Sequence, residues 1–278
     1  SELLVPASQL PKRHKIVTRL HSYEIYAWAP KVNWDHVDGV ILVSQAMKRK
    51  FVALYPAQAH KTTVVYYGKP LDKFGYTQRE FDFSLGMLCG IHPIKRIYEV
   101  ILAVHELRAQ GYRPQLHIGG ARIFVAPGSR YWFAVHRLVE MLKLEDAVTF
   151  HGQVTNPAQW LRGIDVFISN SYWEGQQHAL LEAMATGCYC LSHNWDGADE
   201  MVPEENLFMA ESELCQKIVC YAELPAEEKE RQRAKMRAIA EEKFDIRDTC
   251  AGIRAVLEGV AQGSRGARPS AGMGAALP

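Results

Sequence analysis

The sequence predicts an α/β protein with parallel sheets, and two observations carry that prediction. Short apolar stretches alternate with helix-forming segments from Asp82 to Leu191, which is the pattern of a parallel sheet covered on both faces. The β-branched stretch 164–169 is followed by a polar turn with Gly175 and then by a run of good helix formers. A strand, a polar turn and a helix in this order are typical of nucleotide sites, because ligands collect at the carboxyl ends of parallel strands.

The size and charge of the chain set the class of protein. Its 278 residues suffice for one large or two modest domains. Lys plus Arg number 32 against 31 Asp plus Glu, so the net charge of +1 offers no field for nucleic acid, and we expect no nucleic-acid partner. The six cysteines form no C-x-x-C pair, and neither an apolar run of about 18 residues nor a signal-like leader is present. We therefore expect a reduced, cytoplasmic protein.

The first part of the chain contains three short predicted strands. Residues 1–15 are predicted to be a surface connection; the strands are expected at 16–20, 39–44 and 62–67, with a basic helix from Gln45 to about Tyr55. His21 follows the first of these strands. A histidine at a strand end is as a rule a structural residue, and that interpretation stays open.

The second part alternates strands and helices. We expect strands at 82–89, 115–120, 148–154, 164–169 and 188–192, and helices from 96 to about 110 and at 131–144, 157–163, 212–221, 226–242 and 247–259. Lys95 and Arg96 open the first of these helices and oppose its dipole. An anion bound there would explain the conflict, and two solvated side chains are the alternative. The tail 262–278 is rich in Gly, Ala and Ser, so we expect it to be disordered.

Residues 170–187 read N-S-Y-W-E-G-Q-Q-H-A-L-L-E-A-M-A-T-G. The predicted helix start presents the backbone N–H groups of residues 176–179, which favour an anion. Glu174 lies before this start, and Glu182 lies four residues after His178 and hence on the same helix face. One acid can therefore reach each side of a pyrophosphate and accept hydrogen bonds from sugar hydroxyls. Alternatively, Glu174 interacts only with the helix dipole and Glu182 is solvated.

The run from Glu174 to Gly187 resembles the acidic signature of the retaining glycosyltransferases of family four. These enzymes have the GT-B architecture of two Rossmann-like domains with parallel sheets. Segments 148–154 and 197–200 resemble the strand and the turn that the family places near the nucleotide. The resemblance implies a hexosyltransferase-like enzyme of glycan or glycoconjugate biosynthesis, which moves a sugar from a nucleoside diphosphate to an acceptor with retained anomeric configuration.

The resemblance also implies a set of site residues. The predicted catalytic residues are Glu174 on the donor sugar, Lys95 on the diphosphate and His21 near the donor sugar. The family carries an arginine five residues before this lysine, where the present chain has Gly90, and Arg96 is the candidate for the second charge. The predicted nucleotide-binding residues are Glu182 on the ribose, with Arg96, Gly175, Gln176, Gln177, His178, Gly90 and Val154.

The stretch 67–74, Y-G-K-P-L-D-K-F, resembles the family linker between the two halves, with Tyr67 where asparagine is usual. We therefore expect residues 1–68 to be the C-terminal part of an acceptor-side Rossmann-like domain. Residues 69–245 would be the donor-binding domain, and residues 246–278 a crossover helix and a disordered tail. A complete half needs about 100 residues, so we predict that the first one is incomplete.

No Asp-x-Asp pair occurs, so we expect transfer without a metal and without a cofactor other than the nucleotide sugar. Cys188, Cys190 and His193 could be metal ligands, but their place around one strand favours buried packing. The expected acceptor is a sugar, a lipid-linked molecule or a glycoconjugate. The basic clusters 12–15 and 48–50 with nearby aromatic residues suit peripheral contact with the inner face of a membrane, or else a solvated face.

Two other functions stay open at this stage. A nucleoside-diphosphate-sugar epimerase shares the architecture and needs no acceptor. A non-catalytic sugar-nucleotide-binding module would bind the nucleotide without transfer.

Overall fold

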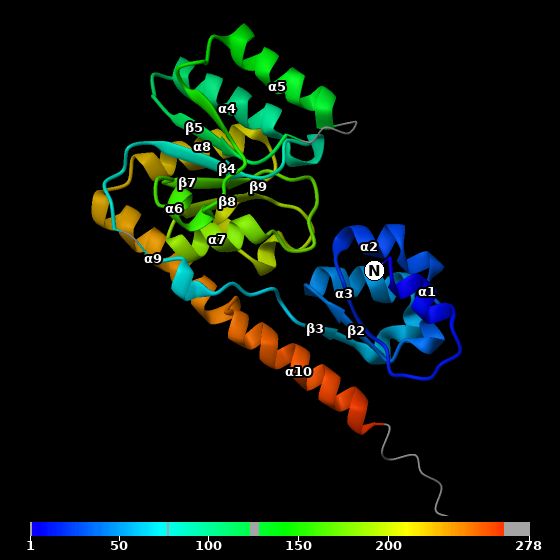
Figure 1. Cartoon of the computed structure of the whole chain (residues 1–278). Coiled ribbons are helices and arrows are strands. Elements are labelled where there is room, and N and C mark those ends of the chain that lie inside the picture. Colours follow the sequence, from blue (N-terminus) through cyan, green and yellow to red (C-terminus); the bar gives the residue numbers. More distant parts are fainter. Residues whose placement is uncertain (1, 77, 123–127, 264–278) are drawn as a thin grey trace, which may run out of the picture.

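A computed structural model describes residues 2–76, 78–122 and 128–263. In them the chain forms two parallel β-sheets, each with helices packed against it (Figure 1). A linker leads from the smaller sheet to the larger one, and the last helix, α10 (Ile246–Gln262), runs back toward the smaller sheet. The predicted α/β fold with parallel sheets is confirmed. The predicted disordered tail lies, from residue 264 on, outside the described residues.

The smaller sheet has three parallel strands in the order β1-β2-β3. Its elements are β1 (Val17–Leu20), β2 (Gly39–Leu42), β3 (Thr62–Val64), α1 (Leu4–Gln9), α2 (Ser22–Ala27) and α3 (Gln45–Leu54). Leu20, Leu42 and Phe51 are fully buried between strands and helices. The rings of Trp34 and Phe51 pack edge to face with centroids 4.9 Å apart, an arrangement that adds to their burial.

Two local predictions for this part are wrong. Helix α1 occupies a segment that the sequence predicts to be a surface connection; Ser8 in it is fully buried, and its Oγ accepts from the backbone N–H of Asn33 at 3.0 Å. Such tertiary contacts stabilise a helix too short to form alone. Strand β3 ends at Val64 rather than Tyr67, because the backbone of Tyr67 bonds to the side chain of Gln176 instead of a neighbouring strand.

The larger sheet has six strands in the order β6-β5-β4-β7-β8-β9, and all neighbours are parallel. The strands are β4 (Ser84–Leu88), β5 (Gln115–Gly119), β6 (Val148–Gly152), β7 (Val166–Ser169), β8 (Tyr189–His193) and β9 (Leu207–Phe208). The chain first adds strands on one side of β4 and then on the other, beginning with β7. The carboxyl ends of β4 and β7 therefore flank the topological switch point, where open parallel sheets bind their ligands.

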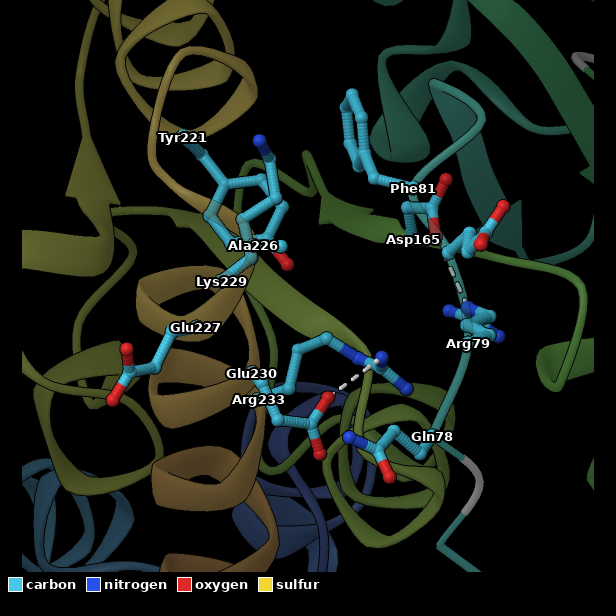
Figure 2. A pocket seen from close by; sticks show the side chains of 11 residues that line it. Gln78, Arg79, Phe81, Asp165, Tyr221, Ala226, Glu227, Lys229, Glu230 and Arg233 are labelled. Carbon is cyan, nitrogen blue, oxygen red and sulfur yellow. Dashed lines mark hydrogen bonds and ion pairs between the residues drawn. The ribbon is translucent and has the colours of Figure 1, made fainter.

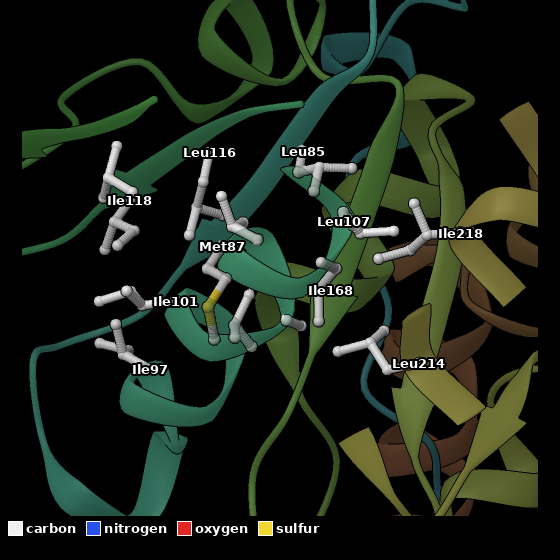
Figure 3. Packing of buried hydrophobic residues seen from close by; sticks show 14 of the residues in the cluster. Leu85, Met87, Ile97, Ile101, Leu107, Leu116, Ile118, Ile168, Leu214 and Ile218 are labelled. Carbon is white, nitrogen blue, oxygen red and sulfur yellow. The ribbon is translucent and has the colours of Figure 1, made fainter. Parts of the chain in front are cut away.

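Helices cover both faces of this sheet. They are α4 (Ile97–Ala109), α5 (Gly128–Leu142), α6 (Pro157–Leu161), α7 (His178–Thr186), α8 (Glu211–Ala222) and α9 (Ala226–Lys243). Side chains of α4, α5 and α8 share one buried cluster with the sheet (Figure 3), and those of α6, α7 and α9 share another. In β7, Val166 and Ile168 join the first cluster and Phe167 the second. This alternation explains why a strand covered on both faces is apolar throughout.

Helix α10 joins the two sheets. Its start is tied to the linker by backbone bonds from Lys69 N to Phe244 O, at 2.8 Å, and from Ile246 N to Lys69 O, at 3.0 Å. Farther along, Gly252 packs on Val65, where an added Cβ would lie 3.0 Å from a methyl carbon. Short 3-10 turns complete the described elements: Ala29–Lys31, Trp34–His36, Pro56–Lys61, Leu71–Lys73, Pro93–Lys95, Ala198–Glu200 and Glu204–Asn206.

Candidate functional site

The loops at the switch point carry an ion pair. Lys95 ends the turn after β4, and Glu174 lies in the loop after β7. Lys95 Nζ donates to Glu174 Oε1, and Ser171 Oγ donates to the same oxygen at 2.7 Å. The two charged side chains are only 22% and 16% exposed. The structure thus brings together two predicted catalytic residues that are 79 positions apart in the sequence; their catalytic roles stay predictions.

Two hydrogen bonds fix these loops to each other. The N–H of Tyr172 donates to the carbonyl of Ile94 at 3.0 Å, and Asn170 Nδ2 donates to the carbonyl of Arg96 at 3.0 Å. Arg96 has a φ of 51°, which is uncommon for a residue other than glycine, and separates the 3-10 turn from α4. Lys95 and Arg96 therefore precede the helix rather than open it, which corrects the predicted helix start.

The guanidinium of Arg96 has other partners than Lys95 and Glu174. Its Nε donates to Glu99 Oε1 at 3.3 Å, and its Cζ lies 4.7 Å from the ring centroid of Tyr172. The structure does not place Arg96 in the Lys95–Glu174 ion pair. Its nucleotide-binding role stays a prediction.

Helix α7 begins at His178, two residues later than predicted, because the two preceding glutamine side chains hold the loop in another conformation. Gln177 Oε1 accepts from Ser169 Oγ. Gln176 bonds twice to the backbone of Tyr67: its Oε1 accepts from the N–H at 2.6 Å, and its Nε2 donates to the carbonyl at 2.9 Å. Gln176 therefore links the loop after β7 to the linker between the sheets.

Glu182 pairs with a residue that the sequence analysis missed. Lys69 Nζ lies 2.6 Å from Glu182 Oε1, and both side chains are about 15% exposed, at 15% and 14%. Lys69 belongs to the linker, so no strand-and-turn pattern singled it out. The pair places one more lysine on the α7 side of the site.

The predicted residues His21 and His178 both contact the ring of Tyr67. The ring of Tyr67 is 4.0 Å from that of His178 and 5.6 Å from that of His21, measured between centroids. The guanidinium of Arg19, on β1, covers the Tyr67 ring at 4.0 Å. His21 and His178, which are 157 residues apart, thus share one aromatic neighbour. Arg19 and Tyr67 were missed as site residues, although Tyr67 stands out as a departure from the family linker.

Both histidines favour the neutral form. Burial, together with the nearby charges of Lys69, His21 and Arg19, lowers the pKa of His178 to about 4. Burial also lowers the pKa of His21, although Glu24 opposes this shift. Each imidazole can therefore donate one hydrogen bond and accept another at neutral pH.

The predicted glycine positions and Val154 make close contacts. An added Cβ at Gly120, whose φ is +142°, would lie 1.8 Å from the carbonyl oxygen of Cys89 and 3.2 Å from the nitrogen of Gly90. The loops after β4 and β5 can meet only because this residue is glycine. An added Cβ at Gly119 would lie 2.7 Å from a methyl carbon of Val154, so Val154 packs at the end of β5.

Contacts between the two sheets surround this site. At Gly175, an added Cβ would lie 3.1 Å from the nitrogen of Ser22, the first residue of α2. Glu200 accepts from the backbone N–H groups of Gln45 and Ala46, both at 2.7 Å, at the start of α3, and from Tyr66 Oη at 2.8 Å. A carboxylate at a helix start is stabilised by the helix dipole, so the predicted family turn holds the two parts together.

The cysteines and the basic clusters have structural neighbours. Cys188 and Cys190 are fully buried, as packing requires. Lys12 and Lys15 pair with Asp38 at 2.8 and 3.0 Å. Arg49 and Lys50 pair with Asp196 at 3.3 and 2.9 Å. Among the described residues, no helix is both long and apolar enough to cross a membrane, and no three His, Cys, Asp or Glu side chains are grouped to hold a metal ion.

A cavity of about 870 Å³ lies at the opposite edge of the larger sheet, by the amino ends of β4 and β7 (Figure 2). Four of its charged lining residues form two pairs: Arg79 Nε lies 3.0 Å from Asp165 Oδ1, and an Arg233 terminal nitrogen lies 3.2 Å from Glu230 Oε2. None of the predicted site residues lines this cavity. It is therefore separate from the loops at the switch point.

Comparisons with known proteins agree with this geometry. The family described as "Glycosyl transferases group 1" matches residues 82–223. HepE of Anabaena, solved with UDP and glucose, has a TM-score of 0.78 and 22% identity over 88% of this chain and 72% of its own. The sucrose-phosphate synthase of Thermosynechococcus elongatus has a TM-score of 0.75 and 17% identity, covering 93% and 70%.

A third solved structure, the pneumococcal O-GlcNAc transferase GtfA with UDP and GlcNAc, has a TM-score of 0.68 and 17% identity over 94% of this chain and 55% of that one. A search of curated protein sequences found no match. The likeness to these solved structures shows that the two sheets have the GT-B arrangement.

Proposed function

The chain belongs to the glycosyl transferases group 1, and from its site we propose that it transfers a sugar from a nucleoside-diphosphate sugar to an acceptor hydroxyl. We further propose that the transfer retains the anomeric configuration and needs no metal. Retention rests on the resemblance of the run from Glu174 to Glu182 to the acidic signature of family four. The observation that carries the proposal is the Lys95–Glu174 pair at the switch point of the larger sheet.

The Lys95–Glu174 pair offers an ammonium group for the leaving diphosphate and a carboxylate for the hydroxyls of the sugar. In the donor complex, Lys95 binds the diphosphate, and Glu174 accepts hydrogen bonds from hydroxyls of the donor sugar. The start of α7 adds N–H groups beside the phosphates. Fixed positive charge at a leaving group stabilises the transition state more than the ground state, and one such group is worth about 100-fold or more in rate. The lysine and the helix start supply this charge without a metal.

The reaction itself exchanges one bond for another. The acceptor oxygen forms a bond to the anomeric carbon, and the bond between that carbon and the phosphate oxygen breaks through an oxocarbenium-like state. The acceptor proton passes to the leaving diphosphate, so atoms and charge balance. The neutral imidazoles of His21, after β1, and His178, at the start of α7, both contact the Tyr67 ring. Each can hold a sugar hydroxyl by donating or accepting a hydrogen bond.

On the other side of the diphosphate we place the ribose at Glu182. A carboxylate can accept from both vicinal hydroxyls, and Lys69 orients this one. The nucleotide-binding roles of Gly175, Gln176 and Gln177 follow from their position between Glu174 and α7. Because HepE was solved with UDP and glucose, a uridine diphosphate sugar is the first donor to test.

The test is an assay of purified protein with uridine, guanosine and deoxythymidine diphosphate sugars, each with and without a panel of saccharide acceptors. We expect acceptor-dependent release of a nucleoside diphosphate and a product with retained configuration. Release of an epimerised nucleotide sugar without acceptor would instead indicate an epimerase. Binding of the nucleotide without turnover toward any acceptor would indicate a binding module.

A further inference from the structure

Three exposed aromatic side chains lie next to the site and are not used by the chemistry above. Tyr23 and Tyr26 of α2 are 56% and 54% exposed, and Trp173, directly before Glu174, is 38% exposed. The two tyrosines are three residues apart on a helix and hence lie on one side of it. The rings of Tyr26 and Trp173 are 6.0 Å apart between centroids, with an angle of 80° between their planes. We call Tyr23, Tyr26 and Trp173 the aromatic patch.

Residues from both parts of the chain bring the patch next to the site. Trp173 shares its loop with Glu174, whose carboxylate is held by Lys95 and Ser171. On the other side, the N–H of His21 donates to Glu24 Oε2 at 2.7 Å, and this bond fixes the start of the helix that carries the two tyrosines. A ligand on the patch would therefore lie beside the proposed donor sugar.

The charges around the patch favour a neutral ligand that carries hydroxyl groups. Tyr23 Oη donates to Glu24 at 3.4 Å, so the nearest charge on α2 is a carboxylate, which is 5% exposed. The lysines of the first basic cluster are engaged with Asp38. An anionic lipid surface needs available cations and is repelled by carboxylates. Aromatic rings present apolar faces with polar tips, which match a pyranose ring with one face of C–H groups and a rim of hydroxyls.

We propose that the aromatic patch binds the acceptor of the transfer and that this acceptor is a neutral saccharide. The inference rests on the proposed function and narrows the acceptor class of the same site. The acceptor ring stacks on Trp173 and Tyr26, so that one of its hydroxyls faces the anomeric carbon of the donor. Exposed aromatic surface at a site formed by two domains is thereby explained.

The first experiment compares Trp173→Ala and Tyr26→Ala with a matched control, Phe133→Ala on α5, whose side chain is 59% exposed and outside the patch. Initial rates are measured with varied saccharide acceptor and with varied UDP-glucose. We expect both patch variants to raise the acceptor KM about 5- to 10-fold, since an aromatic contact contributes on the order of 1 kcal/mol. The donor KM and the rate of acceptor-free hydrolysis of UDP-glucose stay at the control value. In Trp173→Phe, which keeps an aromatic ring, we expect an acceptor KM close to that of the wild type. An acceptor KM unchanged from the control would overturn the proposal.

A second experiment needs no turnover. Maltose, cellobiose and chitobiose are titrated into the wild type and into Trp173→Phe, and tryptophan fluorescence is recorded. We expect a saturable change with at least one disaccharide in the wild type, and its loss in the variant. A fluorescence change with anionic phosphatidylserine vesicles but with no saccharide would overturn the proposal. A saccharide-dependent change in a protein that neither binds nor turns over any nucleotide sugar would refute the proposed function while leaving the patch as a saccharide site.

Discussion

Ion pairs join the loops at opposite ends of β4 and β7, and they differ in construction. At the amino ends, Asp165 receives the guanidinium of Arg79 on one oxygen, and its other oxygen accepts the backbone N–H groups of Asp82 and Ser84 at 3.1 and 3.0 Å. The Asp165 side chain is only 3% exposed. The backbone bonds make this pair a part of the fold, because no ligand could replace them all.

At the carboxyl ends, the Lys95–Glu174 pair consists of side chains alone. Both are several times more exposed than Asp165, at 22% and 16% against 3%. A lysine whose partner is a side-chain carboxylate alone can exchange that partner for a phosphate without breaking backbone hydrogen bonds. The comparison teaches that burial and backbone bonding distinguish a structural ion pair from one available to a ligand, although both flank the same two strands.

We expect the largest effect when the ion pair at the carboxyl ends is broken. Lys95→Ala should lower the transfer rate by about 100-fold or more, because it removes the cation that stabilises the leaving diphosphate. Steady-state kinetics measure this, with Lys235→Ala as control, since Lys235 forms an exposed pair with Glu205. Unchanged turnover would remove Lys95 from the mechanism.

Breaking the ion pair at the amino ends should lower the free energy of unfolding rather than the transfer rate. Asp165→Ala removes the carboxylate that accepts from Arg79 Nε and from two backbone N–H groups, and we expect a loss of roughly 2 kcal/mol in the free energy of unfolding. Asp146→Ala is the control, because Asp146 is 65% exposed in its pair with Arg108 and should change stability by under about 0.5 kcal/mol. Urea unfolding decides between them. Equal stability of both variants would contradict the distinction between the two ends.

A smaller effect separates binding from turnover within the site. Glu182→Ala removes the proposed ribose contact and should raise the donor KM about 10-fold, with kcat within about twofold of the wild type, because the contact is the same in ground and transition states. Glu241→Ala is the control, because the Glu241 side chain is 55% exposed in its pair with Arg237. A lower kcat at unchanged KM would contradict the assignment.

The smallest effect concerns pH. Because the pKa of His178 in the folded protein is about 4, below the ordinary histidine value of 6.5, the unfolded state binds more protons between these two values. The stability from the neutral imidazole is present above about pH 6.5 and is lost as pH falls toward 4. In His178→Asn, the slope of unfolding free energy against pH in this window should decrease by up to about 1.4 kcal/mol per pH unit. His14→Asn, on the surface, is the control; an equal slope in both variants would refute the shift.

Much of the larger sheet could be predicted from the sequence. Strands β4, β7 and β8 are buried along almost all of their length and lie within apolar runs. All five strands from β4 to β8 fall within about two residues of their expected bounds. Glu174, Lys95 and Glu182 could be selected because a motif and a helix-dipole conflict mark them. Lys69, the ion-pair partner of Glu182, and Arg19, which covers the Tyr67 ring, could not be selected. Both reach the site through the relative placement of the two sheets, which no local pattern encodes.

Other features depend on tertiary contacts too. Helices α1 and α2 are six residues long and lack an apolar pattern of their own, so they depend on packing against the smaller sheet. The start of α7 is delayed because Gln176 bonds to Tyr67, a contact between residues 109 positions apart. The positive φ of Arg96 likewise follows from the loop contacts of Asn170 and Tyr172.

The central claim is that Lys95 binds the diphosphate and Glu174 the donor sugar. Calorimetric titration of UDP and of UDP-glucose into the wild type, Lys95→Ala and Glu174→Gln tests it most directly. We predict that Lys95→Ala weakens UDP binding at least about 10-fold, the lower range for a charged hydrogen bond. Glu174→Gln should bind UDP at least as tightly as the wild type, because it frees Lys95, and should lose the added affinity for the glucosyl group. Equal UDP affinity in the wild type and Lys95→Ala would contradict the account.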